Sequence, residues 1–454
     1  MMMPWLRRTV FCPWIAARNG KPYGPELASL RRELALVEDP AARRRLQTER
    51  TQAILTHAYH RSRFYRDRFD AAGFHPERFR DLADLGGVPV LDKGEIIGRQ
   101  DAIRAEGFAD TQLIPTATGG TTGNSFRFWY DRPCAARRDG MTVLANEAYG
   151  WRPGDPTAVV WNAHQDLPTR AADLKARLRN WLSWRHLYID ATHIDEPRLA
   201  AWCDRMASQG IEVVYGYALS IKEIAAYLQA TGRRLPAVRL VVTTAEPLYP
   251  SDRELIERAF ACRVRDRYGS RENGPMAQQD DEGRLRYFAN SMLLEIDGAP
   301  GAPGDVLVTD FWNRAFPFIR YRIGDTAVLP PESPAGRGLP VLGSLTGRQT
   351  DFLIALDGSR VSGMTFHEAY IDEQTHVCGS DAFLQLQFRQ LQRGAILVRI
   401  VPGPSFERQA DEARLGRIAR KILGAAMQVD FEYPRTIERT ASGKYRFTVN
   451  ELES

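Results

Sequence analysis

A chain of 454 residues exceeds one ordinary domain, so we expect two or more domains and a sizeable buried core. Its 44% hydrophobic and 26% charged residues are typical of a globular protein, and no apolar run approaches the roughly 20 residues of a transmembrane helix. The net charge of +5 is small for this length; it suits an anionic small substrate and gives no reason to expect nucleic acid as a partner.

The amino-terminal 18 residues are basic and aromatic, but their apolar stretch is short and broken by Pro13, so we expect no signal peptide. We expect Trp5, Phe11 and Trp14 to pack onto the main domain, with a peripheral membrane contact as the alternative. The five cysteines are scattered and form no C-x-x-C pair, which argues against structural zinc and disulfides. This usage favours a reducing compartment, and we expect a cytoplasmic protein.

Apolar residues at helical spacing predict two helices between residues 25 and 60, with a restart at Pro40. A basic aromatic segment follows, from His60 to Phe69. We interpret it as a helix that packs Phe64, Tyr65 and Phe69 inward, in preference to a nucleic-acid contact.

The stretch from Thr116 to Ser125 has three glycines, five hydroxyl side chains and no acidic group. Strands are expected on both sides of it, at Leu113–Ile114 and Phe126–Tyr130, so the stretch forms a hairpin loop. Convergent N–H groups and hydroxyls predict a phosphate-binding loop, with an ordinary glycine-rich turn as the alternative. A kinase-type loop would need Lys and then Ser or Thr after Gly123, where this chain has Asn124.

Strands and helices then alternate, which predicts a parallel sheet with crossover helices. The expected strands are 158–161, 211–215, 238–243 and 263–268, and the expected helices are 197–209, 220–228 and 251–260. Two helix starts show capping-box spacing, at Ser220 with Glu223 and at Ser251 with Glu254. The basic stretch around Trp181 is interpreted as a solvated amphipathic helix, with a nucleotide or membrane surface as the alternative.

From Arg284 the pattern changes to strands and turns, with strands expected at 292–296, 306–310 and 318–321. Residues 347–454 follow a smaller α+β plan, after a hinge at 347–351. The predicted fold class is therefore α/β: a large N-terminal domain, residues 1–346, with mixed and parallel sheets and crossover helices, and a small α+β C-terminal domain, residues 347–454.

Ligands bind at the carboxyl ends of strands in open parallel sheets, and three loops are expected there: Thr243–Pro247, Tyr268–Gly274 and Tyr215–Ser220. Glu272 lies in the second loop. Its carboxylate is suited to holding Mg²⁺ beside substrate phosphates, with a solvated loop residue as the alternative.

Two further polar residues stand out. Asp325, expected after a strand end and past a glycine, suits accepting hydrogen bonds from two ribose hydroxyls, or it closes a turn. Lys444 follows Ser-Gly near the end of the chain, where it offers a compact point charge to a carboxylate or phosphate, or belongs to a basic surface turn.

These pieces occur in a fixed order: Thr-Gly-Gly-Thr-Thr-Gly, Ala-Glu-Pro, Tyr-Gly-x-x-Glu, Tyr-Arg-x-x-Asp, Gly-Arg-x-x-Asp and Thr-x-Ser-Gly-Lys. This order resembles the adenylate-forming superfamily of acyl-CoA synthetases, peptide-synthetase adenylation domains and luciferases. The length and the Ser-Arg-Phe-Tyr segment at 62–65 are similar to its phenylacetate–CoA ligase branch, including relatives from capsule-polysaccharide clusters.

The resemblance implies a role for each motif. Lys444, Glu272 and Arg348 would be catalytic, with Glu272 the Mg²⁺ ligand, and the small domain would be mobile, swinging between half-reactions. The ATP and AMP contacts would be Thr118, Gly119, Gly120, Thr121, Thr122, Gly123, Ala245, Glu246, Pro247, Tyr268, Gly269, Asp325 and Arg348. Plausible walls of an acid pocket, suited to an aromatic or medium-sized acid, are Trp161, His164, Tyr215, Tyr217 and Thr244.

The implied activity is that of an AMP-forming acid–thiol ligase: a small carboxylic acid reacts with ATP, and the acyl group passes to coenzyme A. A carrier protein or an amine is the alternative acceptor, and the resemblance also admits a homodimer. The chain departs from the family pattern at Gly119, Asn124, Arg271 and Thr350. Asn124 and Arg271 motivate a third alternative, a catalytically impaired nucleotide-binding homologue.

Overall fold

The computed structural model describes residues 2–20, 22–117, 127–161, 174–191, 194–299, 301–330, 338–346, 352–358, 360–362, 382–438 and 446–452. The chain packs into two compact units. The first comprises Met1–Leu248, Asp252–Ile323 and Ala327–Ser344, and the second comprises Tyr249–Ser251, Gly324–Thr326 and Leu345–Ser454. The boundary between residues 346 and 347 stays a prediction.

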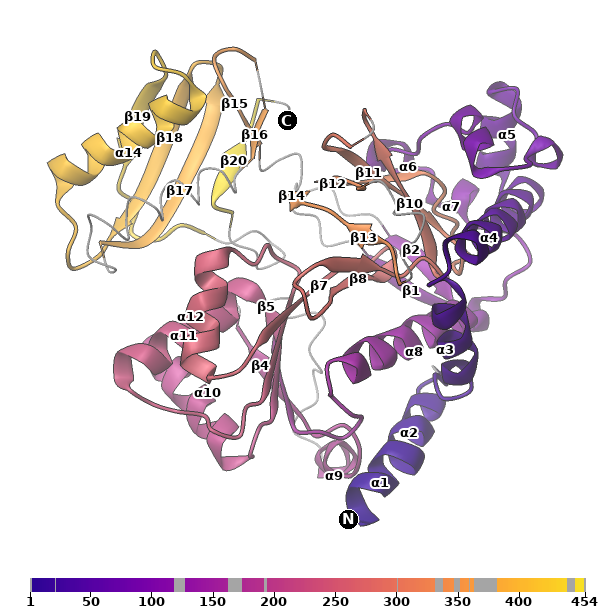
Figure 1. The fold of residues 1–454 in the computed structure, drawn as a ribbon, viewed down its shortest axis with the longest axis horizontal. Helices are drawn as coiled ribbons and strands as arrows, with labels where there is room; N and C mark the ends of the chain where they lie inside the picture. Colours follow the sequence, from indigo (N-terminus) through magenta and orange to yellow (C-terminus); the bar gives the residue numbers. More distant parts are fainter. Residues whose placement is uncertain are drawn as a thin grey trace. The chain divides into compact units, whose positions relative to one another are not determined.

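An eight-stranded sheet forms the centre of the first unit, in the order β13-β9-β8-β7-β6-β5-β3-β4 (Figure 1). The five strands from β7 to β4 run parallel, and β8, β9 and β13 pair antiparallel, so the predicted parallel sheet with crossover helices is confirmed. The strands are β3 (Thr157–Trp161), β4 (His186–Asp190), β5 (Val213–Tyr217), β6 (Leu240–Thr244), β7 (Val264–Ser270), β8 (Gly274–Gln279), β9 (Leu285–Tyr287) and β13 (Val341–Leu342).

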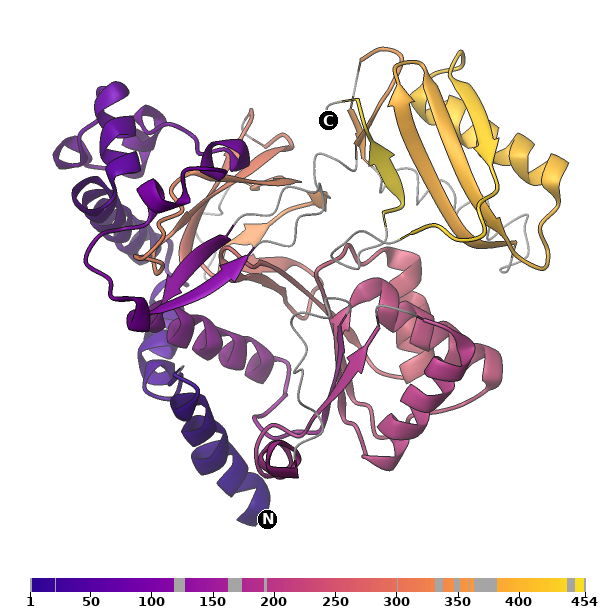
Figure 2. The ribbon, with the colours of Figure 1, turned by 180° about the vertical axis from the view of Figure 1, so that it is seen from behind.

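Helices cover both faces of this sheet because its strands are apolar on both sides. Val214 and Val241 face a core formed with the crossover helices α10 (Glu196–Ser208), α11 (Ala218–Thr231) and α12 (Pro250–Phe260). Val213 and Val242 face the opposite side, towards α8 (Arg132–Ala148) and α2 (Cys12–Arg18). Figures 1 and 2 show α10–α12 on one side of the sheet and α8 on the other.

Both predicted capping boxes are wrong. Helix α11 begins at Ala218, directly after β5, so Ser220 lies inside the helix and is fully buried. Helix α12 begins at Pro250, which places Ser251 in its first turn instead of before it. Proline is favoured at the first helical position, because its ring presets φ and its missing N–H is not needed there. At its other end, Gly232 closes α11 with a φ of 67°.

In a second sheet, β10 (Met292–Asp297) runs antiparallel to β11 (Gly304–Asp310), and β11 lies next to β12 (Tyr321–Ala327). It packs with five of the α-helices that precede the glycine-rich loop, and the helices predicted between residues 25 and 69 are among them. The five are α3 (Glu26–Leu36), α4 (Pro40–Arg61), α5 (Arg63–Ala71), α6 (Lys93–Ile96) and α7 (Gln100–Ile103). The hairpin of β1 (Leu113–Ala117) and β2 (Arg127–Asp131) is also confirmed.

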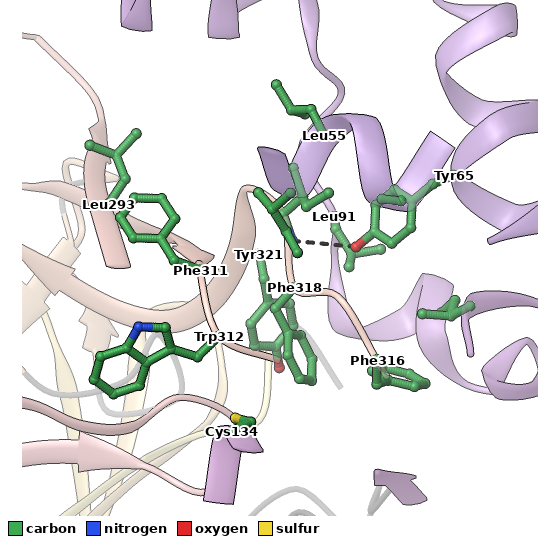
Figure 3. Close-up of a cluster of buried hydrophobic side chains, with 14 of the residues drawn as sticks. Leu55, Tyr65, Leu91, Cys134, Leu293, Phe311, Trp312, Phe316, Phe318 and Tyr321 are labelled. Carbon is green, nitrogen blue, oxygen red and sulfur yellow. Dashed lines mark hydrogen bonds between the residues drawn. The ribbon is translucent and has the colours of Figure 1, made fainter. Parts of the chain in front are cut away.

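The predicted strand at 318–321 is wrong, because β12 starts only at Tyr321. Phe316, Phe318 and Ile319 are fully buried in an aromatic cluster, so their apolar character reflects that packing instead of strand pairing (Figure 3). The Tyr65 hydroxyl replaces part of the missing sheet pairing: it donates to the Pro317 carbonyl at 2.7 Å and accepts from the Ile319 N–H at 3.3 Å.

The amino-terminal segment consists of α1 (Met2–Leu6), a π-helical turn (Arg7–Phe11) and α2. Cys12, Ile15 and Ala16 are buried, and Ala16 packs in a cluster with strand residues of the main sheet, but Trp5 and Trp14 are 59% and 56% exposed. The expectation that both tryptophans pack onto the domain is therefore wrong. Among the described residues, no helix combines the length and the apolar character that crossing a membrane requires.

The second unit has a four-stranded sheet in the order β19-β18-β17-β20. Helix α14 (Arg408–Leu423) packs on this sheet through Leu415, Ile418 and Leu423. The strands of the unit are β14 (Leu345–Thr346), β15 (Phe352–Ile354), β16 (Arg360–Ser362), β17 (Phe383–Gln392), β18 (Ala395–Pro402), β19 (Gln428–Glu432) and β20 (Thr448–Asn450). This is the predicted α+β plan.

Candidate active site

The main sheet changes its winding direction between β3 and β5, because β4 lies on one side of β3 while β5, β6 and β7 follow on the other. Ligands of open α/β sheets bind outside the carboxyl ends of the strands at such a point. The strands that flank it end in Trp161 and Tyr217, whose rings meet edge to face at 4.9 Å. An aromatic pair therefore marks the place where this topology favours a ligand.

Strand register aligns the predicted acid-pocket residues. Tyr217 pairs with Thr244, and Val159, two residues before Trp161, pairs with Tyr215. Because side chains alternate along a strand, these predicted residues lie on one face of the sheet, the face towards α8. His164 lies outside the described residues.

The predicted loop Tyr215–Ser220 does not exist as a loop, because β5 runs through Tyr217 and α11 starts at Ala218. Tyr215 is therefore held in a strand, where it stacks on Trp161 at 5.9 Å and lies under the Arg267 guanidinium at 5.6 Å. A side chain fixed in this way is a rigid wall instead of part of an adaptable loop.

The Ala245–Pro247 motif follows β6, as predicted, and is not part of a helix or strand. Ala245 has a φ of 68°, a conformation that is uncommon for a residue with a side chain. The Glu246 carboxylate accepts the N–H of Leu219 at 3.0 Å, at the start of α11. The motif is thus tied to the neighbouring strand–helix junction, close to Tyr217.

The Tyr268–Gly274 motif is mostly strand, in contrast to the predicted loop: β7 continues to Ser270 and β8 begins at Gly274. Only residues 271–273 form the turn of this hairpin. A Cβ atom on Gly269 would lie 2.7 Å from the Gly274 carbonyl oxygen, so the close approach of the two strands requires glycine here. Glu272 lies at the tip, and the Tyr321 hydroxyl is 3.5 Å from its Oε1.

Arg138 of α8 holds the turn of residues 271–273 through its guanidinium group. We did not predict this residue from the sequence as part of the site. Its Nη2 donates to the Glu272 carbonyl at 2.6 Å and pairs with the Asp310 carboxylate, while its guanidinium lies 4.6 Å above the Tyr130 ring. The Tyr130 hydroxyl in turn donates to the Arg271 carbonyl. Burial raises the pKa of Tyr130 to about 12, so this hydroxyl keeps its proton at neutral pH.

A signal for Arg138 exists in the sequence. The residues Cys134, Arg138, Met141 and Ala145 are spaced as one face of a helix, and all four are buried. An arginine on an otherwise apolar face must be paired, because burying a guanidinium without a partner costs several kcal/mol.

A second buried polar contact lies beside the motifs, between β6 and β7. The Thr243 hydroxyl donates to the Asp266 carboxylate at 2.8 Å. Burial raises the pKa of Asp266 to about 6, well above the usual range of an aspartate. This carboxyl group is therefore partly protonated under mildly acidic conditions.

An aromatic cavity of about 300 Å³ lies against the amino-terminal halves of the parallel strands, on the face towards α8. Tyr215 is the predicted acid-pocket residue that lines it, next to Trp151 and Trp184. His186 also lines it, and burial lowers the pKa of this imidazole to about 4, so it is neutral at physiological pH. Three cavity-lining residues each lie two positions before a predicted acid-pocket residue in the same strand: Val159 before Trp161, Tyr215 before Tyr217 and Val242 before Thr244. Because side chains two positions apart share a face of the sheet, the cavity leads along this face towards the pair Trp161 and Tyr217.

Several predicted site residues lie in other positions than predicted or outside the described residues. Asp325 lies within β12, so the prediction that it follows a strand end is wrong, and so is the alternative that it closes a turn. The phosphate loop Thr118–Gly123, Arg348 and Lys444 lie outside the described residues. In the part of the chain that the structure covers, no group of three or more His, Cys, Asp or Glu side chains is placed to hold a metal ion.

Comparisons with known proteins agree with this architecture. Residues 353–451 match the family model of the CapK C-terminal domain. The chain is 24% identical to Protein CapK of Staphylococcus aureus over 446 residues, covering 96% of this chain and 94% of that protein. It is 28% identical to the phenylacetate-coenzyme A ligase of Escherichia coli (strain K12) over 343 residues, covering 68% of this chain and 72% of that protein.

Among solved structures, 2-hydroxyisobutyryl-CoA ligase in its postadenylation state shares the fold, with a TM-score of 0.70 and 19% identity over 93% of this chain and 92% of that chain. The motif order, the sheet with its winding change and these relatives lead to one conclusion. The chain is similar to adenylate-forming enzymes, and these findings support a place in their phenylacetate–CoA ligase-like branch.

Proposed function

We propose that this protein activates a carboxylic acid with ATP as an acyl-adenylate, releasing pyrophosphate, and then transfers the acyl group to coenzyme A with release of AMP. The observation that supports the proposal most strongly is the position of the motifs. Ala245–Pro247 and the Glu272 turn follow neighbouring strands at the end of the sheet where Trp161 and Tyr217 meet. Nucleotide and acid would then lie side by side.

In the first half-reaction, a carboxylate oxygen attacks the α-phosphorus of ATP, and the bond to pyrophosphate breaks. No side-chain nucleophile is needed, so the chain contributes positioning and charge neutralisation. Ala245, Glu246 and Pro247 would line the adenine, Tyr268 and Gly269 would shape the pocket beside it, and Lys444 would meet the carboxylate and the α-phosphate. Thr118–Gly123 would hold the phosphates, with Asp325 and Arg348 at the ribose.

Glu272 fits the role of a Mg²⁺ ligand. Its carboxylate lies at the tip of a hairpin held by Arg138, with the Tyr321 hydroxyl 3.5 Å from its Oε1, and this one acidic group would complement substrate phosphates. A bound Mg²⁺ would neutralise charge on those phosphates.

In the second half-reaction, a thiolate attacks the acyl carbon, the carbon–oxygen bond to AMP breaks and a thioester forms. We propose coenzyme A as the thiol because relatives named as coenzyme A ligases match two thirds or more of this chain. A carrier-protein thiol or an amine remains the alternative acceptor.

The cavity supports a bulky, largely apolar acid. Its walls are mostly aromatic and aliphatic, and its lining residues Val159 and Tyr215 lie two positions before Trp161 and Tyr217, the pair that marks the proposed acid pocket. Substituents of an aryl or longer acyl acid would pass Tyr215 and enter this space, where neutral His186 offers one polar contact.

A pyrophosphate-release assay over aromatic, hydroxy, amino and fatty acids, with and without coenzyme A, tests the proposal. We expect acid-dependent pyrophosphate release that is strongest with bulky acids, and an acyl-CoA product. Folded protein that releases no pyrophosphate with any acid in the presence of Mg²⁺ would contradict it. Adenylation without turnover on coenzyme A would assign the alternative acceptor.

The position of the acid is tested by Val143→Phe, which fills the cavity from α8. We expect activity with bulky acids to fall and activity with acetate to persist, because acetate does not reach the cavity. An equal loss with both acids would argue against the cavity as part of the acid pocket.

A further inference from the structure

An aromatic-basic surface lies on the amino-terminal segment and α9 (Leu174–Leu182), which contain none of the motifs described above. It consists of the exposed side chains Met3, Trp5, Val10, Trp14, Leu178 and Trp181. These are six of the eleven exposed large hydrophobic residues in the described part of the chain, and Leu178 and Trp181 are 55% and 53% exposed. Such a concentration of tryptophan in contact with water indicates a binding surface.

Contacts between the two segments make this a single surface. The buried Arg7 guanidinium lies 5.4 Å from the centre of the Trp181 ring, which joins the π-helical turn to α9. The neighbouring Arg8 pairs with Asp155 at 3.4 Å and so fixes the turn to the main domain. Figure 1 shows α1, α2 and α9 side by side at the amino-terminal end of the first unit.

The surface is strongly basic. Residues 2–19 and 174–186 contain seven arginines and lysines and no aspartate or glutamate. These are Arg7, Arg8, Arg18, Lys175, Arg177, Arg179 and Arg185. Their formal charge sums to +7, but Arg7 is buried and Arg8 pairs with Asp155, so the surface presents at most five of these cations, on a chain whose whole net charge is +5. The positive charge is thus concentrated where the tryptophans are exposed.

We propose that this surface binds the face of an anionic lipid membrane. Tryptophan rings favour the boundary between lipid and water, and basic residues add attraction to anionic headgroups. Membrane binding of this kind needs a cation next to an exposed aromatic ring, and Arg18 provides one: its guanidinium lies 5.6 Å from the centre of the exposed Trp14 ring. Insertion of the ring would then place the cation at headgroup level.

Charge also decides between a membrane and a second copy of this chain. Self-association through this surface would bring two patches of the same positive sign together, which opposes contact. An anionic bilayer provides opposite charge and an apolar layer for the rings at the same time. The binding is peripheral, in agreement with the lack of a membrane-spanning helix among the described residues.

Sedimentation of the full chain with vesicles tests the proposal. Vesicles of phosphatidylcholine alone are compared with vesicles that also contain phosphatidylglycerol. We expect binding to the anionic vesicles, a decrease in binding at high salt and a blue shift of tryptophan fluorescence. Equal binding to both vesicle types, or none to either, would overturn the proposal.

Two double variants test the residues. Arg177→Gln/Arg179→Gln removes two exposed cations and should lower the partition coefficient about 25-fold, since each basic residue near a membrane contributes about fivefold. Trp5→Ser/Trp14→Ser should lower both the partition coefficient and the blue shift. The thermal midpoint should not change, because the four side chains are exposed.

The matched controls are Arg63→Gln/Arg258→Gln, which removes two exposed arginines elsewhere, and Leu36→Ser/Ile97→Ser, which removes two exposed apolar residues. Both should bind vesicles like the unmodified chain. The proposal is wrong if the surface variants bind like these controls. It is also wrong if velocity sedimentation without lipid shows that the tryptophan variant dissociates a dimer while vesicle binding is unchanged.

Discussion

The Nη2 atom of Arg138 donates to the backbone carbonyl of Glu272 at 2.6 Å. Through this contact, α8 holds the turn between β7 and β8. The Glu272 side chain in this turn is the proposed metal ligand. The same nitrogen pairs with Asp310, so a buried ion pair and the position of Glu272 depend on one guanidinium.

Replacing Arg138 tests this coupling. Arg138→Met leaves the buried Asp310 carboxylate unpaired and should lower the free energy of unfolding by about 3–5 kcal/mol. The double variant Arg138→Met/Asp310→Asn removes both charges and should recover most of this loss, measured by urea denaturation. Pyrophosphate release should stay about tenfold or more below that of the unmodified enzyme, because the Glu272 carbonyl still lacks its donor. Full activity of the double variant would show that Arg138 has only a structural role.

Glu272→Gln keeps the shape of the side chain and removes its charge. We expect the Mg²⁺ and ATP concentrations needed for half-maximal pyrophosphate release to rise about tenfold, because a neutral amide is a weaker ligand for Mg²⁺. Glu282→Gln, at an exposed turn of the following hairpin, is the control. Metal dependence that matches the control would count against Glu272 as a ligand.

Lys444→Ala separates the two half-reactions. We expect adenylation to slow by about 100-fold or more, since a positive charge at the α-phosphate is lost, while thioester formation from supplied acyl-adenylate is retained. Single-turnover assays of each half-reaction measure the two rates, and Lys421→Ala, an exposed lysine on α14, serves as the control. Equal losses in both half-reactions would contradict the role given to Lys444.

Asp266 should make stability depend on pH. Its pKa is raised to about 6 by burial, so the folded state binds this proton more tightly than the unfolded state, and the resulting stability is lost as pH rises from about 4 through about 6. Asp266→Asn removes the ionisation and should raise the free energy of unfolding above pH 6 by about 1–3 kcal/mol. Denaturation curves across this pH range measure the effect. Asp67→Asn, an exposed carboxylate on α5, should leave the pH profile unchanged.

Tyr65→Phe tests the aromatic cluster in Figure 3. The change leaves the Pro317 carbonyl and the Ile319 N–H without their described partner and should lower the free energy of unfolding by about 1–3 kcal/mol. Tyr59→Phe removes an exposed hydroxyl that donates to Asp70 and should change stability by less than about 0.5 kcal/mol. Equal urea midpoints for the two variants would contradict the importance of the buried hydroxyl.

Local pattern was enough to predict most of the parallel sheet, because β3, β5 and β6 are short apolar runs, each with a helix after it in the chain. The pattern missed β4 (His186–Asp190), which was not among the predicted strands. It failed where tertiary contacts replace local ones. The segment at Phe318 is apolar because it packs in the cluster with Tyr65, and no periodicity separates that case from a strand.

The site shows the same division. The order of the motifs indicated the family, but the strands run past their predicted ends. The extension of β5 from Tyr215 to Tyr217 depends on pairing with Thr244 of β6, and the extension of β7 from Tyr268 to Ser270 depends on pairing with β8. Arg138 was missed for a related reason: its partners Asp310 and Glu272 lie more than a hundred residues away. Only the buried helix face that it shares with Cys134 and Met141 pointed to it.

The change of winding direction between β3 and β5 has a consequence for the evolution of enzymes with this fold. The proposed acid pocket rests on Trp161 and Tyr217, whereas the proposed nucleotide contacts follow β6 and β7. Two side chains at the ends of β3 and β5 can be exchanged without altering the backbone that would hold ATP. After gene duplication, one copy could therefore acquire a new acid while it inherits the activation chemistry unchanged.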